Sequence, residues 1–278
     1  MPLQRDLIGI HPILPNIFAK WLTSNDVPVT VTKSHRSLTS QIPINDNDLI
    51  DWLGRKIFEH HHSSDRTEKL KEKYTQLGYT KYAEQHRKLP RVDKVKKGNA
   101  TEIILIEYVQ SSLNKPLFHA YKLRYNPNVD QAIKGDDTLM VDIFNEKGID
   151  KVKLYLGEAK FRKTPSKTVV DTISKSLSKD KRPLSYSFLV DELGRDHKTK
   201  TLSDILEAFI VEEIKGKGDL IYTGFLLSNK DTFKVVESNL NSDNSQMVLI
   251  SIGIDSPEVL IDEVFKKAEY FYANPDKL

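Results

Sequence analysis

An apolar stretch that ends in alternating charged residues, Val152–Lys160, constrains the fold more than any other feature of this sequence. A second stretch with the pattern of a strand, Thr138–Phe144, precedes it across a turn marked by Gly148. Period-two alternation bounded by turn residues is typical of β-strands. We therefore expect these two stretches to pair as adjacent antiparallel strands joined by a short turn.

Helix-like and strand-like patterns alternate around this pair, and the order predicts an α/β fold with three layers. A mixed central sheet with helices on both faces is the architecture that such an order favours. Asn99-Ala100-Thr101-Glu102 is predicted to open a helix as a capping box, and Pro257 to stand at the first position of the last helix. The other predicted elements are a strand over Lys115–Asn126, helices over Lys167–Lys179 and Leu202–Ile214, and strands over Asp219–Ser228 and Gln246–Ile254.

The first third of the chain is less informative. Residues 1–45 indicate loops and short strands, 46–60 a helix with one apolar stripe, and 66–88 one or two charged helices. Arg91–Lys97 is interpreted as a basic connector. We predict an N-terminal helical and irregular region over 1–97, a core domain over 98–230, and a C-terminal strand and helix over 231–278 that pack on the core.

Composition excludes several classes of protein. The 278 residues contain no cysteine, which excludes a disulfide scaffold and thiolate metal sites. The first residues do not have the pattern of a secretory signal, and no apolar run approaches the roughly 20 residues of a membrane span. We expect a cytoplasmic protein.

Charge is strongly segregated although the net charge is only +3. Two segments, 66–97 and 151–200, each carry an excess of seven basic groups. Acidic groups are in excess by three over 98–150 and by seven over 201–278. Basic blocks that flank an acidic one are typical of a polyanion surface around a metal pocket. Solvated helix faces with paired charges are the alternative interpretation.

The residues with the clearest chemistry end the strand Val152–Lys160. Because successive side chains in a strand alternate faces, Glu158 and Lys160 point the same way and Ala159 points into the opposite layer. The adjacent strand begins beside Asp137, so we expect Asp137 to lie close to Glu158. Two carboxylates are hard oxygen ligands for Mg²⁺, and a lysine can orient water or stabilise charge on a phosphate. These groups suit metal-assisted phosphodiester hydrolysis.

Each of these residues also has a structural interpretation. Glu-x-Lys alone is a weak signal, and the chain has a second copy at Glu213-Ile214-Lys215. Asp136 is the rival of Asp137 as a ligand. Glu102 has a ready role in the predicted capping box. Asp142 is interpreted as an outward polar position.

Two basic pairs are candidate nucleic-acid contacts. Lys122 and Arg124 share a face of the strand predicted over 115–126, and Arg162 and Lys163 follow the Glu-x-Lys directly. The histidines are interpreted structurally: His60-His61-His62 as a solvated helix end, and His119 as a satisfied strand histidine.

Asp137 followed by Glu158-Ala159-Lys160, within this order of elements, resembles the PD-(D/E)xK restriction-endonuclease-like nucleases. Asp136 stands where the family name has its proline. The segments Lys97-Gly98-Asn99 before Glu102, Gly135-Asp136-Asp137 and Gly157-Glu158-Ala159-Lys160-Phe161 are similar to the nuclease subunits of Hachiman anti-phage defence systems.

The resemblance covers about residues 97–230. It implies a restriction-endonuclease-like core that cleaves DNA with Mg²⁺, or with Mn²⁺, using Asp137, Glu158, Glu102 and Lys160. It also implies a superfamily-two helicase subunit that pairs with this chain and restrains it. The alternative is a non-catalytic nucleic-acid-binding subunit on the same fold. A glycosidase that uses Asp137 and Glu158 is disfavoured because it leaves Lys160 without a role.

Overall fold

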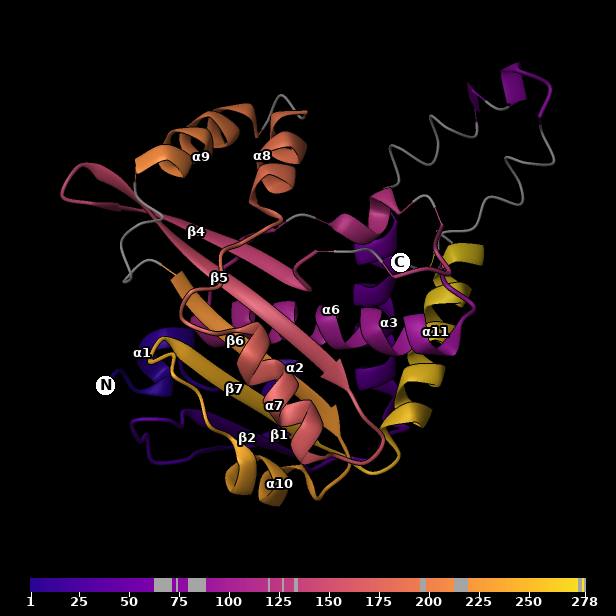
Figure 1. Cartoon of the computed structure of the whole chain (residues 1–278). Helices are drawn as coiled ribbons and strands as arrows, with labels where there is room; N and C mark the ends of the chain where they lie inside the picture. Colours follow the sequence, from indigo (N-terminus) through magenta and orange to yellow (C-terminus); the bar gives the residue numbers. More distant parts are fainter. Residues whose placement is uncertain are drawn as a thin grey trace.

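A mixed sheet runs through the middle of the molecule (Figure 1). The computed structural model describes residues 1–62, 72–73, 75–79, 89–119, 121–126, 128–132, 135–195, 199–212, 220–274 and 277. Within these residues the sheet has seven strands in the order β1-β2-β7-β6-β5-β4-β3. The strands are β1 (Leu22–Asp26), β2 (His35–Ser40), β3 (Phe118–His119), β4 (Thr138–Glu146), β5 (Ile149–Phe161), β6 (Leu220–Ser228) and β7 (Met247–Gly253).

The centre of the sheet is parallel and its margins are antiparallel. β2, β7, β6 and β5 pair in parallel. At the margins the pairing is antiparallel: β1 joins β2, β4 joins β5, and β3 joins β4. The predicted hairpin is confirmed, with Thr138 opposite Gly157 and Glu146 opposite Ile149. β5 therefore has neighbours on both sides, which fixes the end that carries Glu158.

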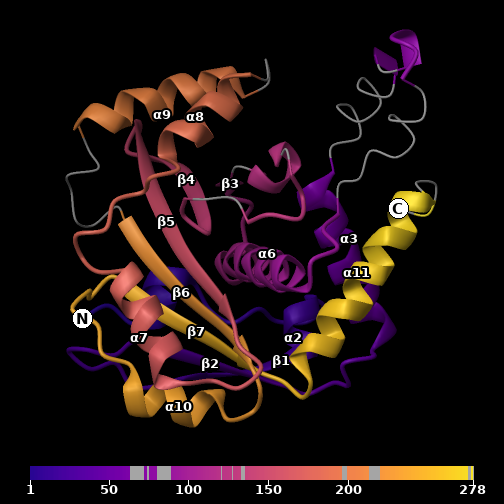
Figure 2. The ribbon, with the colours of Figure 1, turned by 45° about the vertical axis from the view of Figure 1, so that its right-hand side comes forward.

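Helices cover both faces of the sheet, so the predicted three-layer α/β architecture is confirmed. Figure 2 shows α6 lying across one face, with α3 and α11 beside it. The apolar residues of these helices join one face of the strands in a single core. The elements on this side are α1 (Gln4–Ile8), α2 (Ile17–Trp21), α3 (Asn47–His61), α6 (Asp93–Leu113) and α11 (Pro257–Ala273).

The opposite face packs against a second apolar core. α7 and α10 lie over the parallel strands, while α8 and α9 form a pair near β4 (Figure 1). Tyr186 and Ser203 donate hydrogen bonds to backbone oxygens across that pair. The elements are α7 (Lys167–Ser176), α8 (Tyr186–Gly194), α9 (Lys200–Glu212) and α10 (Thr232–Asn239); α8 and α10 are additions to the predicted set.

The helix that carries Glu102 begins earlier than the capping pattern predicts. α6 starts at Asp93, and Lys97 forms an i,i+4 ion pair with Asp93 at 2.6 Å. Asn99 lies inside the helix, where its side chain contacts His61 instead of capping a terminus. The capping-box interpretation of Glu102 and the connector interpretation of Arg91–Lys97 are therefore wrong, because this helix passes through Gly98.

The strand predicted over Lys115–Asn126 is also corrected. Among the described residues of this stretch, Phe118–His119 alone pair with β4, and a 3-10 helix, η1 (Lys122–Tyr125), follows. Arg124 donates two hydrogen bonds to the backbone oxygen of Glu59 on α3, which favours a turn over an extended strand. Lys122 and Arg124 consequently do not share a strand face.

Three polar positions are more buried than expected. His60 and His61 are 3% and 2% exposed, so they do not form a solvated helix end. His60 contacts Glu107 on α6 at 2.9 Å, and this tertiary contact explains the burial. Asp142 is 7% exposed and pairs with Lys115, and it is not an outward position.

All three predicted regions contribute strands to the one sheet, and their boundaries stay a prediction. The charged helices predicted over 66–88 fall mostly outside the described residues, and so does the second Glu-x-Lys, Glu213-Ile214-Lys215. Among the described helices, none is both long enough and apolar enough to cross a membrane.

Candidate active site

The Glu-x-Lys pair occupies the end of β5 and forms the centre of the candidate site. Glu158 and Lys160 lie on the same face of the strand, and Lys160 Nζ is 2.5 Å from Glu158 Oε1. Ala159 packs into the core on the α6 side, as the alternation predicts. The strand thus presents a carboxylate and an ammonium together, at side-chain exposures of 17% and 26%.

Asp137 joins this pair from the residue that precedes β4. Its Oδ2 accepts hydrogen bonds from Ala159 N at 2.9 Å and from Lys160 Nζ at 3.0 Å. The backbone bond ties the loop before β4 to β5 at the level of Glu158. Asp137 and Glu158 therefore share one ammonium, which is the proximity that we expected from the antiparallel pairing.

Asp136 has a different environment from Asp137. Its side chain is 1% exposed and its Oδ2 accepts a hydrogen bond from Ser185 N at 2.8 Å, just before α8. Lys181 Nζ lies 3.3 Å from Oδ1. Asp136 thus anchors the segment between α7 and α8 to the site.

Glu102 approaches the same end of β4 from α6, on the opposite side of the sheet. Lys122 Nζ lies 3.0 Å from Glu102 Oε2 and also donates to the backbone oxygen of Asp136. Burial raises the pKa of Glu102 to about 7; the Lys122 charge opposes this rise, and the Asp137 charge adds to it. Glu102 is therefore coupled electrostatically to Asp137, although the two residues come from different layers of the fold.

The other members of the site are also perturbed by one another. Burial raises the pKa of Glu158, and the negative charge of Asp137 raises it further. For Lys160 burial acts to lower the pKa, but the hydrogen bond to Glu158 and the charge of Asp137 outweigh it and raise the pKa. Perturbed carboxylates of this kind are characteristic of functional sites.

Gly157 is the residue that lets the layers approach at this point. A Cβ atom there would lie 2.0 Å from Thr138 Oγ1 and 2.8 Å from Leu105 Cδ2. Leu105 stands three residues after Glu102, on the same side of α6. The absence of a side chain at 157 therefore brings the Glu102 side of α6 close to the strand that carries Glu158.

The basic candidates differ in their contacts. Lys122 is 16% exposed and lies within the site, and Arg124 stacks over the Tyr121 ring at 3.5 Å. Lys163 is 77% exposed and pairs with Glu258 at 2.7 Å, while Arg162 donates to the backbone oxygen of Phe161. Only the pair that follows β5 combines high exposure with proximity to Lys160.

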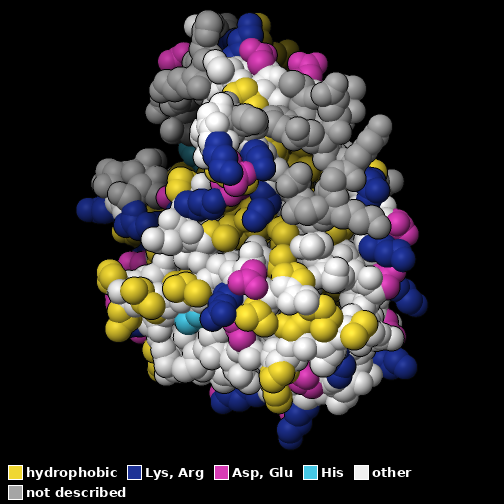
Figure 3. Space-filling model, turned by 90° about the vertical axis from the view of Figure 1, so that its left-hand side faces the viewer, with side chains coloured by type: hydrophobic (Ala, Val, Ile, Leu, Met, Phe, Trp, Pro, Cys, Tyr) yellow, Lys and Arg dark blue, Asp and Glu magenta, His cyan; other side chains and the backbone are white. Residues whose placement is uncertain are grey.

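Figure 3 shows the face at the left of Figure 1, where blue side chains gather at the level of the β4–β5 hairpin beside acidic ones. Within the hairpin itself, Lys151 of β5 pairs with Glu146 of β4 at 2.5 Å. Hydrophobic side chains lie lower on the same face. This face therefore mixes charges of both signs.

Sequence reasoning missed Lys181. Its charge lowers the pKa of Glu158, and its ammonium lies beside Asp136. In the sequence, however, Lys181 lies 45 residues after Asp136, in the segment that precedes α8. The excess of basic residues over 151–200 was the only signal for it. Local periodicity cannot show which lysine of such a block returns to the sheet.

The carboxylates fit a hard cation by their chemistry. Asp137 and Glu158 together carry two negative charges against the one positive charge of Lys160, and oxygen ligands are those that Mg²⁺ and Mn²⁺ accept. Glu102 is held by Lys122 instead. Among the described residues, no group of three or more acidic or histidine side chains is arranged to hold a metal ion.

The fold and this cluster define an α/β protein with a carboxylate–lysine site at the end of a central strand. The family model of HamA matches residues 15–268. A Hachiman protein HamA from Bacillus cereus is 36% identical over 277 residues, which cover 97% of this chain and 96% of that relative. The chain therefore belongs to the HamA family.

Proposed function

We propose that this chain is a metal-dependent DNA nuclease of the PD-(D/E)xK superfamily and the effector subunit of a Hachiman anti-phage defence complex. The observation that carries the chemistry is the ammonium of Lys160 between Asp137 and Glu158. Membership of the HamA family supports the defence role. The name of the Bacillus cereus relative supports the assignment to a Hachiman system.

Each residue has a proposed role in phosphodiester hydrolysis. Asp137 and Glu158 would hold Mg²⁺ or Mn²⁺, which would supply Lewis-acid stabilisation of the phosphate, and Glu102 would complete the set once it leaves its ion pair with Lys122. Lys160 orients the attacking water or stabilises charge that develops on the phosphate. Arg162 and Lys163 contact the flanking phosphates of DNA, and Lys122 and Arg124 contribute to the basic surroundings of the site.

A superfamily-two helicase is the proposed partner. A nuclease without a sequence-reading module would damage its host unless it were restrained. We propose that the helicase holds this chain inactive on intact DNA inside the cytoplasm. The exposed apolar residues of the N-terminal region support an interface of this kind, because apolar surface that stays exposed is typical of docking sites.

One observation favours a second candidate function. The described residues do not assemble a three-ligand metal group, and Lys122 pairs with Glu102. This arrangement favours a non-catalytic subunit that holds nucleic acid for its partner on the same fold. The two functions differ in whether the chain itself breaks phosphodiester bonds.

Plasmid cleavage by the purified chain distinguishes the two functions. We expect nicking or degradation with Mg²⁺ or Mn²⁺, none with EDTA, and none from Glu158→Gln, which keeps the shape of the side chain. Glu263→Gln on α11 is the matched control, because that carboxylate is 40% exposed and, in the part of the chain that the structure describes, its ion-pair partner is the exposed Lys266. DNA that remains intact with the wild-type chain, while the chain still binds it, would support the non-catalytic function.

A further inference from the structure

Each of the three proposed metal ligands contacts an ammonium group of the chain itself. Lys160 lies between Asp137 and Glu158. Lys122 Nζ lies 3.0 Å from Glu102 Oε2. A divalent cation that takes all three carboxylates as ligands therefore has to displace an ammonium group from Glu102.

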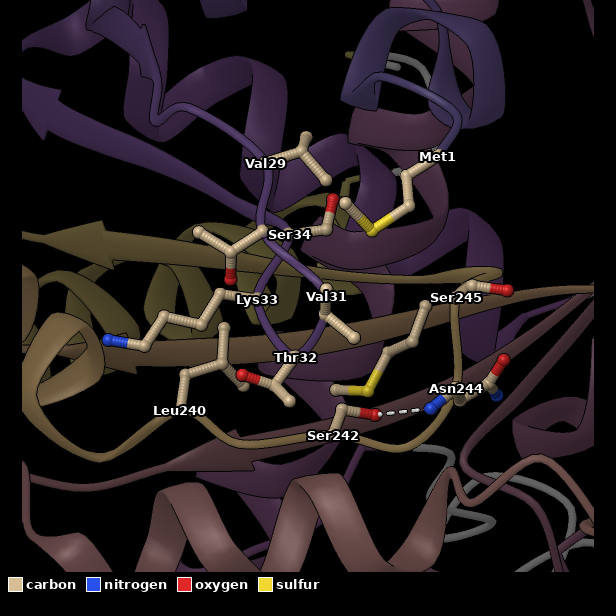
Figure 4. Close-up of a pocket in the computed structure, with 12 residues that line it drawn as sticks. Met1, Val29, Val31, Thr32, Lys33, Ser34, Leu240, Ser242, Asn244 and Ser245 are labelled. Carbon is tan, nitrogen blue, oxygen red and sulfur yellow. Dashed lines mark hydrogen bonds between the residues drawn. The ribbon is translucent and has the colours of Figure 1, made fainter.

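Two recesses of the molecule lie apart from this cluster. One, beneath the N-terminal segment, has only about 10 Å³, and the side chains of Met1, Val29 and Val31 crowd it (Figure 4). The other has about 390 Å³ and lies between the edge strand β3 and α8. None of the three proposed metal ligands lines either recess. What a cation meets at these carboxylates is therefore set by the neighbouring side chains of the cluster.

Lys122 connects two elements of the fold at the site. Its ammonium contacts Glu102 on α6 and donates a hydrogen bond of 3.0 Å to the backbone oxygen of Asp136, in the loop before β4. Asp137 is the next residue of that loop. A cation held by Glu102 and Asp137 would join the same two elements. Lys122 thus has, with a single positive charge, the bridging position that the proposed function gives to a metal ion.

The backbone around Lys122 is held against a third element, α3. Arg124, two residues further along η1, donates hydrogen bonds of 2.9 Å and 2.6 Å to the backbone oxygen of Glu59. The same guanidinium stacks over the Tyr121 ring at 3.5 Å. The ammonium of Lys122 is therefore brought to Glu102 by an anchored turn of the chain.

The burial of the ion pair favours a role other than stability. The side chains of Lys122 and Glu102 are each 16% exposed. Removal of two charges from water offsets much of their attraction, so a buried pair contributes little net stability. The charge of Asp137 also acts on Glu102 and raises its pKa, so a second carboxylate lies within electrostatic range of the pair.

We propose that Lys122 is an autoinhibitory latch: its ammonium holds Glu102 until a divalent cation displaces it. With the latch closed, Asp137 and Glu158 are left as two ligands, and with the latch open Glu102 becomes the third. Because Lys122 and the cation compete for one carboxylate, the apparent metal affinity falls with the fraction of molecules in which the latch is open. The latch rests on the proposed function, since it regulates the proposed metal site.

Titration of the full chain with Mn²⁺ tests the latch without DNA and without cleavage. Electron paramagnetic resonance of the free ion gives the Kd. Lys122→Met keeps the length of the side chain and removes its charge, so we expect it to bind Mn²⁺ about tenfold tighter than the wild type, as for a latch that is closed in about nine molecules of ten. Lys122→Gln, whose amide can still donate to Glu102 and Asp136, should shift the Kd in the same direction and serves if Lys122→Met does not fold.

Two controls separate the latch from a general effect of charge. In a Glu102→Gln background, Lys122→Met should leave the Kd unchanged, because no carboxylate remains to be released. Lys115→Met removes an ammonium from another buried carboxylate, Asp142, and should keep the wild-type Kd. Asp142 is five residues along the chain from Asp137, or roughly 16 Å at the rise of a strand.

The outcomes distinguish the latch from the metal site itself. An unchanged Kd in both Lys122 variants, when their Tm values stay near that of the wild type, overturns the latch and leaves the metal site in place. Equal tightening in the Glu102→Gln background also overturns it, since Lys122 would then act by its charge alone. A wild type and variants that all fail to bind Mn²⁺ overturn the proposed metal-dependent function and the latch together. Tighter binding by Lys122→Met in a chain that never cuts DNA keeps the latch and refutes the nuclease.

Discussion

The ammonium of Lys160 lies 3.0 Å from Asp137 Oδ2 and 2.5 Å from Glu158 Oε1. One positive charge between two carboxylates leaves the cluster net negative, and the raised pKa of Glu158 reflects burial and the Asp137 charge. A bound cation would relieve this repulsion. The charges at the end of β5 and in the loop before β4 are therefore coupled through Lys160.

Loss of either carboxylate should abolish cleavage without unfolding the chain. We expect Asp137→Ala and Glu158→Ala to lower plasmid cleavage at least ~100-fold, the scale of losing one preorganised electrostatic group. Cleavage kinetics with Mg²⁺, beside circular dichroism for the fold, provide the measurement.

Asp136 provides the contrast. Because its carboxylate accepts from Ser185 N and is buried, Asp136→Asn should lower Tm more than it lowers cleavage. If Asp137→Ala cleaved DNA at the wild-type rate and Asp136→Ala did not cleave it, Asp136 and not Asp137 would be the metal ligand.

Gly157→Ala should destabilise the fold. The added Cβ would meet Thr138 Oγ1 at 2.0 Å and Leu105 Cδ2 at 2.8 Å, so the α6 layer must move away from β5. Overpacking of this kind costs about 1–3 kcal/mol. Urea unfolding measures the change, and Thr138→Ala in the same chain should recover part of it.

Gly98→Ala is the matched control for Gly157→Ala. It lies within α6, and its Cβ would meet nothing within 4 Å, so the higher helix propensity of alanine should stabilise the chain by up to about 1 kcal/mol. Equal stability of the Gly157→Ala variant and the wild type would contradict the close approach of the two layers.

The hairpin and the meeting of Asp137 with Glu158 were predictable because both follow from local alternation and a short turn. The length of α6 was not, since Asn99 imitates a cap while contacts with His61 hold it inside the helix. β3 was overpredicted because Arg124 bonds to Glu59, 65 residues away in sequence, and curls the chain into η1. Tertiary contacts outweighed the local pattern at each of these points.

The two basic residues after β5 should contribute to DNA affinity through phosphates. Replacing Arg162 and Lys163 with alanine should weaken binding of every DNA sequence and lower the salt slope by roughly 0.9 for each lost contact. Binding isotherms at several salt concentrations measure the slope. Lys266→Ala on α11, which removes another lysine of high exposure, should keep the wild-type slope, and an unchanged slope in the double variant would exclude the proposed contacts.

Buried histidines should make the chain sensitive to mild acid. Burial, with the charges of Arg124 and Lys56, lowers the pKa of His60 to about 3, below the ordinary value of 6.5. The unfolded chain therefore binds a proton that the folded chain rejects, and stability falls as the pH drops below 6.5. From pH 7.5 to 5.5 this one group accounts for a loss of about 1.4 kcal/mol.

Chemical unfolding of His60→Gln at these two pH values isolates that contribution. The variant should lose about 1.4 kcal/mol less than the wild type over the interval. Phe58→Leu, which perturbs the same helix without removing a titratable group, should retain the wild-type loss. Identical losses in all three proteins would show that His60 does not titrate between the folded and unfolded states as predicted.

Pairing with a helicase is the prediction on which regulation depends. We expect residues 1–96 and the acidic segment 201–278 to form much of the interface with the helicase. The acidic segment would face a basic surface of the helicase, because complementary charges speed association. The N-terminal region exposes a set of apolar side chains that water does not favour: Met1, Ile10, Ile13, Leu14 and Val31, at 65%, 63%, 76%, 70% and 79%.

Co-expression with the helicase should give a stable heterodimer by size-exclusion chromatography with light scattering. Ile13→Asp with Leu14→Asp should weaken it at least tenfold, because two buried carboxylates would lack partners in the interface. Leu184→Asp, equally exposed but outside both segments, should leave pairing unchanged. Within the heterodimer, cleavage of intact duplex DNA should stay low until free ends or ATP-driven translocation release it. A chain that digests DNA at one rate with or without the helicase and ATP would refute the restraint and leave the chemistry of Asp137 and Glu158 untouched.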